Sequence, residues 1–173
     1  MIRRTVVALC VVLGLALVLS GCSASGDEVA DDRLPDVTLA GFDGGEDVDL
    51  GEFSGPAVIS LWASWCPPCR KEMPILEEFH AAYGDRITLL GIDFQDLQTE
   101  KARALVEEAG VTFALVSDQD GEISGKGAFP VLRGLPYLAF VDDDGSVTHV
   151  EAVKITSTDQ LADLVGQHLG TTL

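Results

Sequence analysis

Two cysteines lie three positions apart in the segment Trp65-Cys66-Pro67-Pro68-Cys69. Thiols at this spacing can form a disulfide with each other and exchange it with a second thiol. A bridge across two intervening residues closes so small a loop that it constrains the unfolded chain little. We therefore interpret the pair as a reactive group rather than as a structural cross-link.

The other two of the four cysteines lie near the start of the 173-residue chain. A short positive start and the apolar run Thr5 to Leu19, which contains Cys10, are typical of an export signal. The run is shorter than the roughly 20 residues of a membrane-spanning helix. Leu19-Ser20-Gly21-Cys22 resembles a bacterial lipobox. We predict that residues 1–21 are a lipoprotein signal peptide and that Cys22 carries a lipid on the extracytoplasmic face of the cell membrane. The alternatives are an uncleaved anchor helix or an ordinary secretory signal.

The composition separates a short linker from one domain and excludes some partners. Residues 22–33 are rich in Gly, Ser, Ala and acids, so we predict a flexible acidic tether there and a single domain over 34–173. With 11 basic and 28 acidic side chains the net charge is −17, and no cluster of Lys or Arg is present. This charge excludes a general nucleic-acid-binding protein, because phosphate binding needs such clusters.

The cysteine pair could instead be half of a zinc site. A structural zinc ion takes four ligands, usually from two such pairs. The chain has no second pair, and His80, His149 and His168 are not spaced as ligands. We therefore expect no metal ion and no cofactor.

Apolar patterning predicts the elements around the pair. Alternating strands and helices followed by a hairpin and a last helix indicate an α/β domain with a mixed sheet. The expected strands are 37–39, 48–50, 57–62, 87–93, 113–116, 137–141 and 147–150, and the expected helices are 66–83, 99–109 and 157–169.

The pair lies where a strand gives way to a helix. Because a residue before proline avoids the helical region, Cys66 suits the N-cap and Pro67 the first helical position. The partial positive charge of a helix N-terminus lowers the pKa of a thiol there. Cys66 is therefore the expected nucleophile. Cys69, one turn later, is the expected resolving thiol and is expected to be the more buried of the two.

Several motifs together resemble the thioredoxin superfamily, and within it the TlpA/ResA/CcmG-like membrane-tethered thiol–disulfide oxidoreductases. The segment from Trp62 to Cys69 matches the active-site motif, and Met73-Pro74 matches the helix-kinking proline. Gly134-Leu135-Pro136 matches the strand that begins after a cis-proline. Residues from about 96 to 117 match the helix-and-strand insertion of this family. The resemblance implies a thioredoxin fold with an N-terminal strand extension and this insertion.

The resemblance also implies a groove for the substrate segment. It makes Pro136 a cis-proline facing the cysteine pair, whereas a trans-proline that opens a strand is the alternative. We expect Trp62 in the core. The side chains expected to line the groove are Trp65, Pro67, Pro68, Leu135 and Pro136.

The resemblance also implies which residue acts as acid and base. Plain thioredoxin has a buried aspartate where this chain has Ser60, which cannot relay a proton as a carboxylate does. ResA-like members use a glutamate three residues after the second cysteine, and Glu72 matches it. Burial beside the thiols would raise the pKa of Glu72 and let it accept the Cys69 proton. An ordinary exposed helix glutamate is the alternative, and Asp93 is a weaker second candidate.

The implied function is a monomeric extracytoplasmic thiol–disulfide oxidoreductase. The resemblance favours a reductase of exported protein disulfides, among them those of cytochrome c maturation, recharged by a membrane thiol donor. A peroxiredoxin-type thiol peroxidase is one alternative, although Ala63 stands where those enzymes have Thr or Ser. A copper-binding chaperone is another, although that branch has three residues between its cysteines.

Overall fold

The structure is a computed structural model that describes residues 32–173. The predicted signal peptide, the predicted lipidation site Cys22 and the tether up to residue 31 lie outside the described residues. None of the helices in the part of the chain that is described is long and apolar enough to cross a membrane.

A seven-stranded mixed sheet forms the centre of the domain, in the order β2-β1-β5-β4-β3-β6-β7. β3, the strand that leads to the cysteine pair, lies between β4 and β6. It is parallel to β4 and antiparallel to β6. β5, the strand of the predicted insertion, is parallel to β4 and extends the sheet on the β4 side. The strands are β1 Thr38–Gly41, β2 Val48–Asp49, β3 Ala57–Trp62, β4 Thr88–Phe94, β5 Ala114–Asp118, β6 Tyr137–Val141 and β7 Val147–Glu151.

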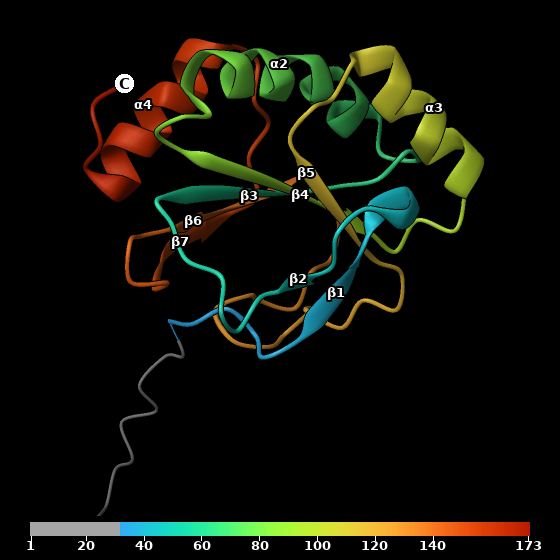
Figure 1. The fold of residues 1–173 in the computed structure, drawn as a ribbon, viewed down its shortest axis with the longest axis horizontal. Helices are drawn as coiled ribbons and strands as arrows, with labels where there is room; N and C mark the ends of the chain where they lie inside the picture. Colours follow the sequence, from blue (N-terminus) through green and yellow to red (C-terminus); the bar gives the residue numbers. More distant parts are fainter. Residues whose placement is uncertain (1–31) are drawn as a thin grey trace, which may run out of the picture.

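Three α-helices lie together on one face of this sheet, with α2 between α3 and α4 (Figure 1). They are α2 Pro67–Tyr83, α3 Thr99–Ala109 and α4 Thr158–Leu169, and a 3-10 turn, η1, spans Phe42–Gly44. Pro74 lies inside α2, as the resemblance implies. Ser157 caps α4, because its hydroxyl accepts a hydrogen bond from the Gln160 N–H at 3.2 Å.

The sheet divides the apolar core into two layers. Under the helices, Phe79 of α2 and Val165 of α4 pack with Phe140 of β6. On the opposite face, the segment after β5 contributes Ile123 and Phe129, which cover apolar residues of the central strands. Burial on both faces explains why the central strands are nearly continuous apolar runs.

The predicted elements are confirmed, with ends that shift by one or two residues. The fold class is the predicted mixed α/β sheet with the N-terminal strand pair and the helix-and-strand insertion. The predicted tether ends differently, because Asp32 and Arg33 contact the β6–β7 turn. Arg33 forms a β-bridge with Ser146, and the Asp32 carbonyl accepts a hydrogen bond from the Val147 N–H at 2.6 Å. The last two residues assigned to the tether are therefore held on the domain.

Candidate active site

The cysteine pair lies where β3 leads into α2. Cys66 has extended backbone angles, φ −91° and ψ 105°, and caps the helix, and Pro67 is the first helical residue. The N–H of Cys66 donates to the Ala63 carbonyl at 3.1 Å, which closes the turn between strand and helix. The predicted N-cap arrangement is confirmed, and it places both sulfur atoms at the positive end of the helix.

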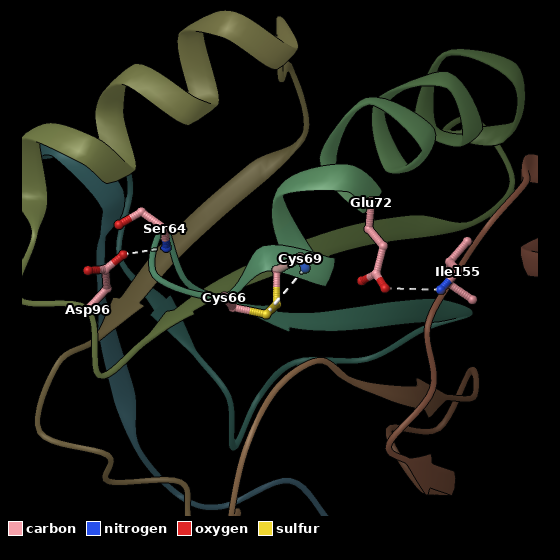
Figure 2. Close-up of a disulfide and its surroundings, with 6 residues drawn as sticks. All are labelled: Ser64, Cys66, Cys69, Glu72, Asp96 and Ile155. Carbon is pink, nitrogen blue, oxygen red and sulfur yellow. Dashed lines mark hydrogen bonds between the residues drawn. A yellow bond between two sulfur atoms is a disulfide. The ribbon is translucent and has the colours of Figure 1, made fainter.

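Cys66 and Cys69 form a disulfide. The Cys69 N–H donates to the Cys66 sulfur at 3.2 Å (Figure 2). Because Pro67 and Pro68 have no N–H, Cys69 provides the first backbone donor of the helix. The exposed fractions of Cys66 and Cys69 are 2% and 1%. The greater burial of Cys69 expected from the sequence is therefore absent in the disulfide form.

The two tryptophans before the pair have different environments. Trp62 is buried and packs against the Phe42 ring at a centroid distance of 5.7 Å. A Cβ atom at Gly91 would lie 3.1 Å from Trp62 Nε1 and 2.5 Å from Leu115 Cδ2, so glycine leaves the space that the indole needs. Trp65 is 45% exposed, and its indole N–H donates to the Gln95 carbonyl at 3.2 Å. Trp62 therefore belongs to the core and Trp65 is partly exposed, as predicted, and the place of Trp65 in a substrate groove stays a prediction.

The other residues predicted to line the groove differ in exposure. The Leu135–Pro136 peptide bond is cis, as the resemblance implies. Pro136 is buried, and Leu135 and Pro68 are half-buried. Pro67 is exposed. Exposed apolar surface next to the disulfide is therefore provided by Trp65 and Pro67.

Glu72 lies one turn beyond Cys69 on the same face of α2 (Figure 2). It is buried, with 3% of its surface exposed, which excludes the exposed-glutamate alternative. One carboxylate oxygen accepts a hydrogen bond from the Ile155 N–H at 3.1 Å. Desolvation raises the pKa of Glu72 to about 7, against smaller lowering effects of this hydrogen bond and of Lys154. A carboxyl group with this pKa can gain or lose a proton at neutral pH.

A second buried acidic group lies on the other side of the disulfide. Asp96 accepts hydrogen bonds from the Ser64 N–H at 2.5 Å and the Gln98 N–H at 2.9 Å, and so fixes the loop before Cys66 (Figure 2). Asp93 pairs in register with Trp62, and neither of its carboxylate oxygens has a protein hydrogen-bond partner. Burial, and next the charge of Asp96, raise the pKa of Asp93 to about 8.

Sequence reasoning missed Asp96. Its only signal is an aspartate just after a buried strand that ends near the motif, which is common in α/β folds. Asp93 was identified as a candidate, and its burial agrees with that expectation. Asp93 lies on β4, next to the strand β3 that carries Ser60. Ser60 pairs with Gly91, two residues before Asp93.

Comparison with known proteins places the chain in a family. Residues 29–166 match the Redoxin family model. The thioredoxin-like protein YneN of Bacillus subtilis is 31% identical over 137 residues, which are 76% of this chain and 78% of that protein. The thiol-disulfide oxidoreductase ResA of Geobacillus thermodenitrificans is 28% identical over 98% of this chain and 94% of its own.

A solved structure agrees in both fold and class. A secreted disulfide oxidoreductase of Mycobacterium tuberculosis, described as homologous to Escherichia coli DsbE, superposes with a TM-score of 0.65 at 28% identity. The match covers 80% of this chain and 99% of that one. The chain therefore belongs to the Redoxin family and has a thioredoxin-like fold. Within that family it is a thiol–disulfide oxidoreductase that carries its CxxC pair at Cys66 and Cys69.

Proposed function

We propose that the protein is a reductase of disulfides in exported proteins, with Cys66 as nucleophile, Cys69 as resolving thiol and Glu72 as proton acceptor. The observation that carries the proposal is the buried carboxyl of Glu72, which lies one turn from the resolving cysteine and has a pKa of about 7. A resolving thiol must lose its proton before it can attack, and a base of this pKa accepts that proton at neutral pH.

The reaction consists of two displacements. The Cys66 thiolate attacks one sulfur of the client disulfide, which releases the first client thiolate and leaves a mixed disulfide. Cys69 then passes its proton to Glu72 and attacks the Cys66 sulfur. This step releases the second client thiolate and forms the disulfide described in the structure. Two electrons pass to the client, and a thiol donor must return them to the pair.

The backbone helps the first displacement. In the disulfide form the Cys69 N–H already points at the Cys66 sulfur. After reduction the same N–H is placed to donate to the Cys66 thiolate, and the helix N-terminus adds its positive partial charge. Both effects favour attack by Cys66 over attack by Cys69.

Replacing Glu72 with glutamine is expected to slow the second displacement about tenfold or more at pH 7. The wild-type rate of this step should rise as pH passes through about 7, because Glu72 becomes able to accept a proton there. That rise should be lost in Glu72→Gln, since an amide cannot accept the proton. Stopped-flow measurement of client-thiol release from pH 5 to pH 9 tests this.

The matched control is Glu78→Gln, an exposed glutamate on the same helix. It should retain both the rate and the pH profile. If Glu72→Gln has the profile of the wild type, Glu72 is not the proton acceptor.

The reduction potential of the Cys66–Cys69 couple tests the direction of electron flow. The purified protein is equilibrated in glutathione or dithiothreitol buffers, and its free thiols are counted. We expect a potential near or below about −220 mV, towards the −270 mV of thioredoxin. A potential near about −120 mV would make the protein a disulfide donor and reverse the proposed direction.

The proposed place of action is the outer face of the cell membrane, with Cys22 as lipid anchor and a membrane thiol protein as electron donor. Support comes from the lipobox-like sequence and from the secreted relative of Mycobacterium tuberculosis. Apocytochrome c is the proposed client, because the relatives include ResA and a homologue of DsbE, and the protein is proposed to act as a monomer. Mass spectrometry of the membrane fraction would detect a diacylglyceryl group on Cys22.

A further inference from the structure

Two histidines that are far apart in the sequence stack on each other at the edge of the sheet. His149 of β7 and His168 of the last turn of α4 have ring centroids 4.1 Å apart and an interplanar angle of 6°. Phe140 of β6 lies behind them, 4.7 Å from the His168 ring. The spacing of the histidines in the sequence indicated no metal site, and folding is what brings these two together.

A carboxylate completes the group. Glu151 lies two residues after His149, on the same face of β7, and its Oε1 is 3.6 Å from His168 Nε2. That oxygen is buried and has no hydrogen-bond partner, which is costly for a carboxylate. Among residues 32–173, this is the one group of three metal-ligand side chains whose ligand atoms all lie within 4.8 Å of one another.

We propose that His149, Glu151 and His168 bind a divalent transition-metal ion of the zinc type. Two imidazoles and one carboxylate form a common ligand set for such ions. A zinc–nitrogen bond of about 2.0–2.1 Å requires ligand atoms about 3.4 Å apart, so binding needs side-chain rotations of about 1 Å that take the rings out of parallel. A fourth ligand, water or another group, would complete the four-coordinate site.

The ion would add a bond between two elements that already meet through the stacked rings and the contact of Glu151 with His168. His149 and Glu151 belong to β7, and His168 belongs to α4, so one ion would tie the last helix to the edge strand. None of the three residues belongs to the thiol-exchange machinery, and the site is therefore separate from the proposed reductase function.

Isothermal titration of the purified disulfide form with ZnCl₂ tests the proposal, since its two active-site sulfurs are bonded to each other and do not compete for zinc. We expect one zinc ion per chain and a higher melting temperature with zinc. His149→Asn, His168→Asn and Glu151→Gln should each weaken binding about tenfold or more.

His80→Asn is the matched control, because His80 lies on α2 against Phe113, at a centroid distance of 5.8 Å, and should not contribute. Circular dichroism and melting curves without zinc show which variants fold. If one ligand variant fails to fold, the other two still decide the question. The proposal is wrong if wild type binds no zinc up to about 1 mM, or if folded ligand variants bind zinc as wild type does.

Discussion

Replacing Cys66 with serine is expected to lower thiol–disulfide exchange about 10³-fold or more, whereas replacing Cys69 with serine should stop the reaction at a mixed disulfide. The two cysteines are almost equally buried in the disulfide form, so exposure does not distinguish their roles. Their positions on the helix do, because Cys66 caps α2 and its sulfur accepts the Cys69 N–H. Only the Cys66 thiolate is stabilised in this way.

Non-reducing gels and mass spectrometry after mixing each variant with a disulfide-containing client test this assignment. Cys69→Ser should accumulate a covalent complex through Cys66, and Cys66→Ser should accumulate little or none. Melting temperatures of both variants and of reduced wild type serve as the folding control. Accumulation of a complex through Cys69 in the Cys66→Ser variant would reverse the two roles.

Replacing Asp93 with asparagine is expected to stabilise the protein by about 2–4 kcal/mol at pH 8 and to change its stability little at pH 4. The folded state holds the pKa of Asp93 at about 8, against an ordinary value of 3.8. Between these values the folded state keeps a proton that the unfolded state has released. Stability therefore falls as pH rises from about 4 to about 8, by up to about 1.4 kcal/mol per pH unit from this group. Asparagine does not titrate, but it still buries a polar group, so the gain is smaller than the full sum.

Urea unfolding at pH 4, 6 and 8 measures this difference, with the protein kept in its disulfide form. Asp163→Asn, an exposed position on α4, is the matched control and should change stability little at any pH. A difference between Asp93→Asn and wild type that stays constant with pH would mean that Asp93 is charged in the folded protein.

The sequence predicts the strands and helices around the cysteine pair well, because these elements depend on local signals. The apolar run of β3, the proline after Cys66 and the glycine after α3 each define an element from its own residues. Cys66 as N-cap follows from the same local rules. The cis form of Pro136 has no local signal and was implied only by the resemblance to a known family.

Contacts between distant segments are the part that could not be predicted. The hydrogen bond from Ser64 to Asp96 joins two loops 32 residues apart, and that from Ile155 to Glu72 spans 83 residues. The stacking of His149 on His168 depends on how α4 packs against β7. Such contacts are determined by the register of the sheet and the packing of helices on it, which no short pattern encodes.

The contact between Arg33 and Ser146 determines where the N-terminal segment joins the domain. The start of β3 pairs with the end of β6, since Ala57 lies opposite Val141, and the β6–β7 turn follows directly. The chain thus enters the domain at the end of the sheet where β3 begins (Figure 1). The disulfide lies beyond the other end, where β3 finishes and α2 begins.

If Cys22 carries the proposed lipid, its tether would join the domain at the end of the sheet opposite the cysteine pair. The ten residues from Cys22 to residue 31 span at most about 35 Å when fully extended. Clients in the space outside the membrane would then meet the cysteine pair directly. A donor embedded in the bilayer would instead need a domain that projects well above the lipid, or the tethered oxidoreductase would have to reorient before each reduction of its disulfide.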